Sequence, residues 1–275
     1  MLVLCQVAPA ASLVYTSNVA ATQPDISRRV NILGVRIHNC DEAGAVQAIE
    51  GFLREQPARL HQVCTVNPEF VMEARRNPAF RDLLNRVDLA TPDGVGIVAA
   101  ARLLGTPVKG RATGVALVDR LARLSAEEGY SLFLLGAAPG VAEEAADALR
   151  RRYPRVRIAG TYAGSPQEED LPDILGRLAS AQPDVLMVAY GAPRQDMWIR
   201  EHRDVLPPSI KVAMGVGGVF DYLSGRAPLA PRIVRRAGLE WLYRLATQPW
   251  RWRRILRVFA FAALALRAAI VKRET

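Results

Sequence analysis

The sequence has few of the residues from which metal and disulfide sites are built. Its 275 residues include three cysteines and three histidines. Cys5, Cys40 and Cys64 show no C-x-x-C spacing, so they predict neither a disulfide framework nor a zinc site. Three thiols without a pairing pattern fit a protein of the reducing cytosol.

Two glycine motifs and one targeting motif are also missing. Neither G-x-G-x-x-G nor G-x-x-x-x-G-K-[ST] occurs, so the sequence predicts neither a dinucleotide fingerprint nor a P-loop. The first 24 residues carry no charge, so the positive region of a signal peptide is missing. We expect residues 1–29 to form a loosely ordered leader.

Positive charge is concentrated at one end of the chain. The net charge is +9, and residues 229–275 contain eleven Arg and Lys residues but only two acidic residues. The other 228 residues hold 25 basic and 25 acidic groups, so they are neutral overall. A nucleic-acid-binding domain carries its basic residues on the fold itself. The distribution therefore predicts a basic C-terminal appendage and no nucleic-acid partner.

Segments with strand and helix patterns alternate from residue 30 onward. Apolar, β-rich runs predict strands at Val30–Ile37, His61–Val66, Val87–Ala90, Ser131–Leu135, Arg157–Thr161, Val185–Tyr190 and Lys211–Val216. Apolar residues at three- and four-residue spacing predict helices at Asp41–Glu55, Val115–Glu128 and Val141–Arg152. This alternation predicts an α/β domain over residues 30–228, with a mainly parallel sheet covered by helices on both faces.

The last 47 residues form a region of different composition. Tryptophans are interleaved with arginines there, and an apolar stretch follows at Ile255–Val271. Its longest uninterrupted apolar run has nine residues, whereas a transmembrane helix needs about 20. Tryptophan and arginine beside an apolar helix favour a helical appendage, residues 229–275, that lies on an anionic membrane surface. The alternative is a basic pair of helices that packs on the core and exposes its arginines to water.

Four predicted strands run directly into loops that contain glycine and proline. These loops are Thr91–Gly96, Gly136–Gly140, Gly191–Gln195 and Gly215–Gly218. The carboxyl ends of parallel strands share one edge of the sheet, and ligands of open α/β sheets bind in the crevice at that edge. Each loop alone is weak evidence, but together the four predict a binding site.

Asp93 is the strongest candidate for a catalytic group. An aspartate before glycine is often only a turn or cap residue. A carboxylate at the end of a strand, in a loop flanked by glycine, is also suited to take a proton from a hydroxyl nucleophile. Thr65 and Asn67 end the preceding strand; they suit hydrogen bonds to a sugar or phosphate, or they simply form the turn into a helix. Glu69 is predicted to cap that helix.

Five further residues are candidates for substrate or nucleotide binding. Arg111 precedes a helix, and a guanidinium beside a helix N-terminus suits a diphosphate, although a surface arginine is an equal alternative. Gly136 opens the loop after an apolar strand. The amide of Gln195 suits a base or a sugar hydroxyl. Gly217 allows close approach of the backbone, and Asp221 suits ribose hydroxyls.

The order and spacing of five motifs resemble a known family. The motifs are TVNPE at 65–69, PDGVG at 92–96, KGR at 109–111, GAPRQD at 191–196 and GVGGVFD at 215–221. As a set they are similar to the WecG/TagA/CpsF family of glycosyltransferases, and the resemblance runs from about residue 30 to the C-terminal tail.

The resemblance implies a Rossmann-like core and an inverting sugar transfer that needs no metal. The donor would be a UDP-sugar and no other cofactor would take part. The acceptor would be a polyprenyl-diphosphate-linked sugar on the cytoplasmic face of the membrane, in the synthesis of exopolysaccharide, capsule or cell-wall polymer. The lack of a D-x-D motif, which many sugar transferases use to hold a metal on the donor, agrees with this expectation.

Individual residues match the positions of the family that carry function. Asp93 matches its proposed base, Thr65 a residue beside that base, and Arg111 and Gln195 positions that engage the donor. The resemblance further implies that the tail docks at the membrane and completes the site with basic residues. It leaves open the identity of the sugar, the tail arginine involved and self-association as a homo-oligomer.

Two other classes of function compete with the transferase. A peripheral membrane adaptor would keep the nucleotide-sugar fold without catalysis, and the joint retention of Thr65, Asn67, Asp93, Arg111 and Gln195 argues against it. A soluble Rossmann-type enzyme would have no need to gather its excess charge beside tryptophans. The sequence therefore favours a glycosyltransferase at the membrane surface.

Overall fold

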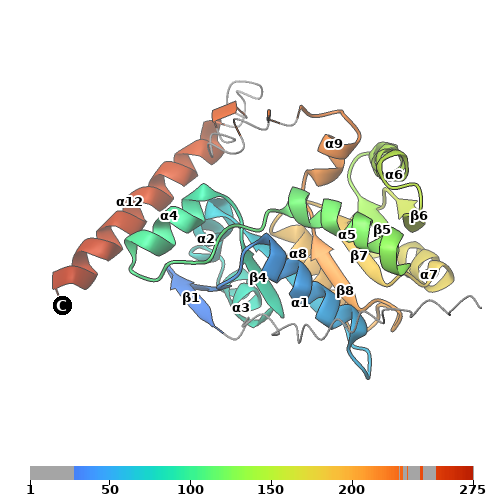
Figure 1. Ribbon diagram of the computed structural model, residues 1–275, viewed down its shortest axis with the longest axis horizontal. Coiled ribbons are helices and arrows are strands. Elements are labelled where there is room, and N and C mark those ends of the chain that lie inside the picture. The colour runs from blue at the N-terminus through green and yellow to red at the C-terminus, as the bar shows by residue number, and fades with distance from the viewer. Residues whose placement is uncertain (1–27, 229, 232–233, 235–241, 244–251, 275) are drawn as a thin grey trace, which may run out of the picture.

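The computed structural model describes residues 28–228, 230–231, 234, 242–243 and 252–274 (Figure 1). Its centre is a six-stranded sheet in the order β4-β3-β8-β7-β5-β6, in which all neighbouring strands are parallel. The strands are β3 (His61–Val66), β4 (Leu89–Pro92), β5 (Ser131–Gly136), β6 (Arg157–Tyr162), β7 (Val185–Ala189) and β8 (Val212–Gly215). The predicted parallel sheet is confirmed.

Helices cover both faces of this sheet, as the sequence predicts. On one face lie α1 (Glu42–Arg54), α5 (Gly114–Glu128) and α6 (Val141–Arg152). On the other face lie α2 (Pro68–Ala74), α7 (Leu171–Ala181) and α8 (Arg194–His202), with α3 (Pro78–Arg86) packed between α2 and α8. Successive strand residues serve opposite faces, so Leu134 packs with the first group and Leu135 with the second. Burial on both faces explains why the inner strands β5, β7 and β8 are almost entirely apolar, whereas the edge strand β6 is only partly buried.

Three further elements complete this part of the chain. They are α4 (Val95–Leu103), the single 3₁₀ turn η1 (Glu168–Asp170) and α9 (Val219–Leu223). The helix predicted at Asp41–Glu55 is confirmed, and Asp41 caps it, because the Asp41 carboxylate accepts a hydrogen bond from the Gly44 N–H at 2.9 Å. The helix begins one residue later, at Glu42.

The prediction of a single strand at Val30–Ile37 is wrong. The segment forms a separate antiparallel hairpin of β1 (Arg29–Ile32) and β2 (Val35–His38). The turn residues Leu33 and Gly34 both have positive φ, 51° and 94°. Two consecutive residues of positive φ match the tight hairpin turn whose twist suits antiparallel strands. The turn is difficult to predict from the sequence, because Gly34 is its one typical turn residue and the rest of the segment reads as a continuous strand.

The hairpin is anchored to the edge of the main sheet by His38. Its Nδ1 accepts a hydrogen bond from the Ala90 N–H of β4 at 2.8 Å, and the ring is buried. Burial, assisted by the neighbouring Arg29 guanidinium, lowers the pKa of His38 to about 4. The side chain is therefore neutral at physiological pH and acts as a fixed hydrogen-bond partner.

A long C-terminal helix, α12 (Trp252–Glu274), packs against α2 and α4 at one end of the molecule (Figure 1). Phe261, Ala265 and Ala269 are its buried contacts. None of the helices that the structure describes is both long and apolar enough to cross a membrane. The expectation of a helix at 255–271 is confirmed, whereas the tryptophan side chains of the tail lie outside what the structure describes.

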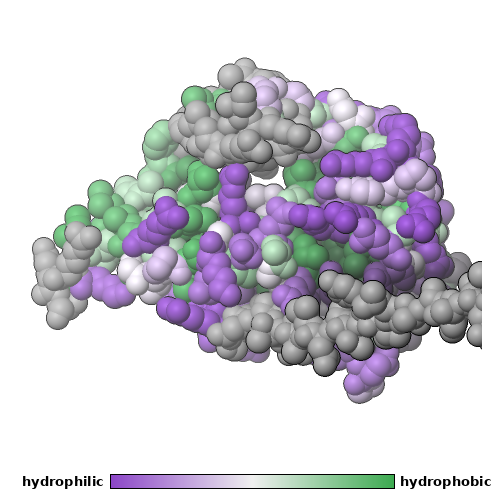
Figure 2. Space-filling view, in the orientation of Figure 1, coloured by the Kyte–Doolittle hydropathy of each residue, from purple (hydrophilic) through white to green (hydrophobic). Residues whose placement is uncertain are grey.

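The opposite side of α12 is apolar as well. Leu256, Phe259, Leu266 and Ile270 recur at helical spacing and are each about half exposed, at 56%, 58%, 51% and 49%. Figure 2 shows apolar side chains gathered at the end of the molecule that α12 occupies. The helix therefore has two apolar sides, of which the core covers one.

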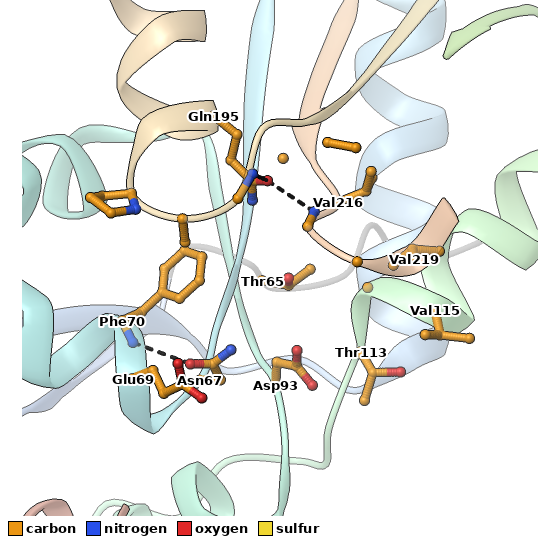
Figure 3. A pocket seen from close by; sticks show the side chains of 18 of the residues that line it. Thr65, Asn67, Glu69, Phe70, Asp93, Thr113, Val115, Gln195, Val216 and Val219 are labelled. Atoms are coloured by element: carbon orange, nitrogen blue, oxygen red, sulfur yellow. Dashed lines mark hydrogen bonds between the residues drawn. The ribbon is translucent and has the colours of Figure 1, made fainter. Parts of the chain in front are cut away.

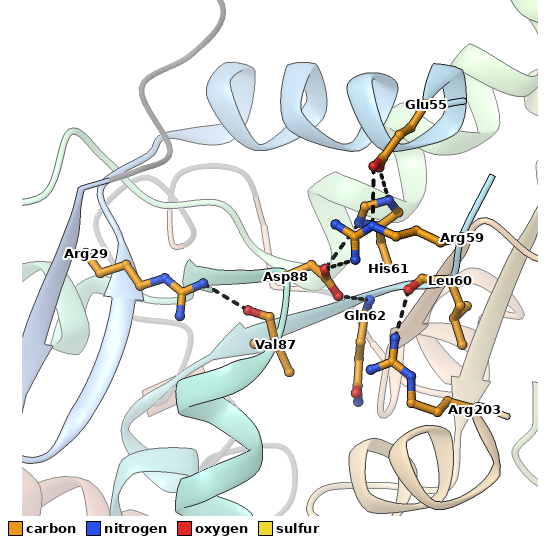
Figure 4. Close-up of polar contacts among 9 residues, drawn as sticks. All are labelled: Arg29, Glu55, Arg59, Leu60, His61, Gln62, Val87, Asp88 and Arg203. Carbon is orange, nitrogen blue, oxygen red and sulfur yellow. Dashed lines mark hydrogen bonds and ion pairs between the residues drawn. The ribbon is translucent and has the colours of Figure 1, made fainter. Parts of the chain in front are cut away.

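A polar cluster holds the amino-terminal edge of the sheet (Figure 4). His61 at the start of β3 is fully buried, stacks on Phe52 at 4.0 Å, and presents its two ring nitrogens to the carboxylates of Glu55 and Asp88. Arg59 contacts the same two carboxylates. Burial raises the pKa of Asp88, but hydrogen bonds from His61, a backbone N–H and Arg59 outweigh burial and hold it well below its usual range. This cluster fixes the starts of β3 and β4.

Candidate active site

A polar cavity of about 680 Å³ lies at the carboxyl ends of β3, β4, β7 and β8. This is the edge at which the four loops were predicted to meet. Seven of the eight residues predicted to form the site line the cavity, namely Thr65, Asn67, Asp93, Arg111, Gln195, Gly217 and Asp221. Figure 3 shows Thr65 and Asp93 near its centre and Gln195 across from them.

The strand order explains why residues far apart in sequence meet here. In the parallel ladder Thr65 of β3 lies opposite Thr91 of β4, two residues before Asp93. The Asp93 N–H continues the ladder by donating to the Val66 carbonyl at 2.9 Å. After Asp93 the chain turns through Gly94, whose φ of 87° favours glycine, and enters α4. The backbone of Asp93 is thus fixed at the carboxyl edge of the sheet, from which its side chain lines the cavity.

Asn67 has a structural task besides its predicted role. Its Oδ1 accepts a hydrogen bond from the Phe70 N–H at 3.1 Å and so caps α2. The expectation that Glu69 caps this helix is wrong. The residue before a proline is held in an extended conformation, which is the geometry of a cap position, and Asn67 occupies it ahead of Pro68. The Glu69 side chain instead lines the cavity.

Arg111 reaches the cavity from a loop that is tied to β4. The Ala112 N–H donates to the Pro92 carbonyl at 2.8 Å, and the Thr91 hydroxyl donates to the Ala112 carbonyl at 2.9 Å. Thr113 then caps α5, whose N-terminus opens on the same cavity. A guanidinium and a helix N-terminus therefore face one space, an arrangement that suits a phosphate or diphosphate.

Gln195 is placed differently from its predicted role of reading a base or a sugar. The residue is 2% exposed. Its Oε1 accepts hydrogen bonds from the Gly191 N–H at 3.1 Å and the Gly217 N–H at 2.9 Å. The amide therefore joins the loop after β7 to the loop after β8. It shapes the floor of the cavity through these two backbone contacts.

Gly217 and Asp221 lie on the same wall, and Gly136 does not. Gly217 has a φ of 54°, so its glycine identity allows the turn that places its N–H on Gln195. Asp221 lies in the first turn of α9 and lines the cavity. Gly136 lies behind the wall, because a Cβ there would be 2.9 Å from the Tyr190 ring. It allows Tyr190, which does line the cavity, to pack closely on β5.

Sequence reasoning missed three charged residues of the cavity wall. Glu42 opens α1, Glu73 lies on α2, and Arg257 comes from α12, where its Nη1 lies 3.8 Å from the Glu73 carboxylate. Glu73 follows Glu69 by four residues on α2, so helical spacing could have predicted that the two side chains lie on the same face of the helix. No local pattern singles out Arg257 from the other tail arginines. The described part of the chain contains no group of three or more His, Cys, Asp or Glu side chains placed to hold a metal ion.

A parallel sheet with a polar cavity at its carboxyl edge defines the general class of α/β proteins that bind ligands at a switch in strand order. Within that class the sequence matches the WecG/TagA/CpsF family of glycosyl transferases over residues 30–275. The chain belongs to this family, as its motifs predict, and is a glycosyltransferase.

Two relatives illustrate the similarity. Both are called N-acetylglucosaminyldiphosphoundecaprenol N-acetyl-beta-D-mannosaminyltransferase. The protein of Bacillus spizizenii is 35% identical over 205 residues, which cover 74% of this chain and 78% of the relative. The protein of Staphylococcus aureus (strain MRSA252) is 32% identical over 246 residues, which cover 90% of this chain and 94% of the relative.

The crowding at the end of β8 gives a prediction about the cavity floor. A Cβ at residue 215 would lie 2.5 Å from both Asp196 Oδ1 and Gln195 Nε2. We expect Gly215→Ala to lower the free energy of unfolding by about 1–3 kcal/mol, because neither buried side chain has room to withdraw. Gly176→Ala is the matched control: a Cβ there meets nothing within 4 Å. Urea unfolding of both variants measures the free energy of unfolding. A Gly215→Ala variant as stable as the unaltered chain would contradict the described packing.

Proposed function

We propose that this chain transfers a sugar, with inversion, from a UDP-sugar to a polyprenyl-diphosphate-linked sugar during the synthesis of a cell-wall polymer, capsule or exopolysaccharide. The names of the relatives favour N-acetylmannosamine as the sugar and N-acetylglucosaminyl-diphosphoundecaprenol as the acceptor. The observation that carries the proposal is the placement of the Asp93 carboxylate in one cavity with Thr65, Arg111 and the N-terminus of α5.

The proposed mechanism is a single displacement. Asp93 accepts the proton of the acceptor hydroxyl while that oxygen attacks the anomeric carbon of the donor. The new glycosidic bond forms as the bond between the anomeric carbon and the diphosphate oxygen breaks, and UDP leaves. Arg111 and the free N–H groups of α5 stabilise the charge that develops on the diphosphate. Thr65, which lines the same cavity, orients the acceptor.

We assign the tail arginine that completes the site to Arg257. Among the described side chains of α12 it is the one that lines the cavity, and the Glu73 carboxylate lies 3.8 Å from its Nη1. A guanidinium on the helix that faces the membrane suits the diphosphate of a lipid-linked acceptor. The half-exposed apolar side of α12 supports the further proposal that this helix lies at the inner face of the cell membrane and brings the cavity to its acceptor.

Asp93→Asn tests the assignment of the base. The amide has nearly the same shape but takes no proton, so we expect the transfer rate to fall about 100- to 10,000-fold with folding unchanged. Transfer from UDP-N-acetylmannosamine to a short-chain acceptor, followed by mass spectrometry, measures the rate. Asp173→Asn, which alters an exposed ion pair on α7, is the matched control. Substantial activity in Asp93→Asn removes Asp93 from this role.

Metal independence is tested with the same assay. Because the proposal assigns the leaving-group charge to Arg111 and to helix α5, we expect EDTA to leave the rate unchanged. A control with added magnesium should give the same rate. Complete inhibition by EDTA that a divalent ion restores would contradict a transfer without metal.

Membrane binding depends, in this proposal, on the exposed apolar side of α12. We expect the double substitution Phe259→Glu and Leu266→Glu to reduce sedimentation with phosphatidylglycerol vesicles by at least about tenfold, because it puts two charges against the lipid. Val205→Glu is the control, since Val205 is equally exposed, at 57%, and lies in the loop after α8. Undiminished binding of the double variant argues against α12 as the membrane contact.

A further inference from the structure

A second cavity, of about 290 Å³, lies near the start of β3, and the proposed function gives it no role. Its wall comes from β3, from the end of α3 and from the end of α8 with the residue that follows each helix, namely Gln62, Leu83, Arg86, Val87, Arg200 and Arg203. Thr65, near the other end of β3, lines the active-site cavity. The two cavities therefore belong to opposite edges of the sheet.

Positive charge exceeds negative charge around this second cavity. Three of its six lining residues are arginines. Asp82 faces two of them: its Oδ1 lies 2.9 Å from Arg86 Nε, and its Oδ2 lies 3.0 Å from Arg200 Nη2. The third, Arg203, donates to the Leu60 carbonyl at 3.1 Å (Figure 4). Three guanidinium charges thus meet the single charge of Asp82.

The arginines also have more hydrogen-bond donors than these partners can satisfy. A guanidinium carries five N–H donors, whereas the partners are two carboxylate oxygens and one carbonyl oxygen. Arg200 Nη1 is buried and has no hydrogen-bond partner among the described residues. A buried cationic donor without an acceptor is costly. An anion in the cavity would supply the acceptors that the wall lacks.

The arrangement of the donors suits a phosphoryl group. The arginines approach the cavity from two helices, Arg86 from α3 and Arg200 from α8, while Arg203 directly follows α8. A carboxylate is planar and matches one guanidinium fork, whereas the tetrahedral oxygens of a phosphoryl group accept from several forks at once. Leu83 and Val87 give the same cavity an apolar part, which suits the carbon skeleton of an organic phosphate.

We propose that this cavity is a second anion-binding site, which takes a phosphoryl group through Arg86, Arg200 and Arg203. We call it the arginine site. It lies apart from the cavity that holds Asp93, so it does not rest on the proposed function. A free phosphate compound and the phosphate headgroup of a lipid offer the same oxygens, and the experiments below distinguish these two sources.

Titration of the full chain with inorganic pyrophosphate tests the arginine site. At about 0.15 M ionic strength, calorimetry should give a dissociation constant below about 1 mM. The double substitution Arg86→Gln and Arg203→Gln should weaken binding at least about tenfold, because it removes two of the three forks. The matched control is Arg150→Gln with Arg177→Gln, which removes two exposed arginines that are each paired with a nearby aspartate.

The active-site cavity also contains a guanidinium, Arg111, so its contribution must be separated. Arg111→Gln should leave pyrophosphate binding at the arginine site in place. Equal affinity of the unaltered chain and the Arg86/Arg203 double variant overturns the proposal. An equal loss in the matched control, abolition of binding by Arg111→Gln alone, or a dissociation constant above about 1 mM overturns it as well.

Asp82→Asn gives a prediction of the opposite sign. The substitution removes the carboxylate that competes for Arg86 and Arg200, so pyrophosphate affinity should rise at least about threefold. Asp173→Asn is the control for charge, since it alters an exposed ion pair on α7. An arginine cluster that served only to pair with Asp82 would gain nothing. Unchanged or weaker binding by Asp82→Asn, or an equal gain in Asp173→Asn, contradicts the arginine site.

Arg200→Lys keeps the positive charge but loses the planar fork. We expect pyrophosphate affinity to fall about fivefold, because a lysine acts on phosphate as a point charge. Urea unfolding confirms that the variant is folded. Affinity equal to that of the unaltered chain would show that Arg200 contributes charge alone and would contradict its assignment to the site.

Sedimentation with vesicles identifies the source of the phosphoryl group. Phosphatidylcholine vesicles that contain phosphatidic acid are compared for the unaltered chain and the Arg86/Arg203 double variant. Loss of both vesicle binding and pyrophosphate binding supports a lipid headgroup, whereas loss of pyrophosphate binding alone supports a free phosphate compound. Retention of both overturns the proposal. None of these measurements uses a sugar donor or acceptor, so a failure of sugar transfer would count against the proposed function and leave this test intact.

Discussion

The site depends above all on the parallel hydrogen-bond ladder that places β3 between β4 and β8. Its register sets Thr65 opposite Thr91 and continues through the Asp93 N–H to the Val66 carbonyl. The next strand pair brings the loops after β7 and β8 to the same edge. Because every strand of this group runs in one direction, all four carboxyl ends open on a single crevice. A slip of one residue in this ladder would turn Thr65 into the core and close the site.

The two edges of the sheet are stabilised by different means. At the amino-terminal edge the Asp88 carboxylate accepts a hydrogen bond from Arg59 and lies 3.3 Å from His61, and these contacts join the start of β3 to the start of β4. At the carboxyl edge the backbone N–H groups of two loops are satisfied by one side chain, Gln195. Rigid anchoring at one edge allows the other to consist of glycine loops, which gain little stability from packing of their own.

Much of this arrangement follows from local sequence patterns, and the exceptions have physical causes. Strand ends and helix starts are local, so β3, α5 and the loop of Asp93 could be predicted from apolar runs, glycines and caps. The hairpin of residues 29–38 could not be predicted in this way, because nothing in the apolar run indicates that Leu33 has a positive φ. The position of Arg257 could not either, since it depends on how α12 packs on α2 and α4. Local rules predict where helices and strands form, whereas the packing of α12 places Arg257 at the cavity.

Gln195 and Asp196 show where a motif alone misleads about roles. Their side chains are polar, adjacent and part of a loop at the expected edge, so ligand contact is the natural expectation for both. In the folded chain Gln195 is 2% exposed and accepts hydrogen bonds from the backbone of two loops, whereas Asp196 is fully buried and accepts a hydrogen bond from the Cys64 thiol. Polar residues of these loops thus divide between half-buried side chains that line the cavity, such as Asp93, and buried ones that hold the loops in shape, such as Gln195.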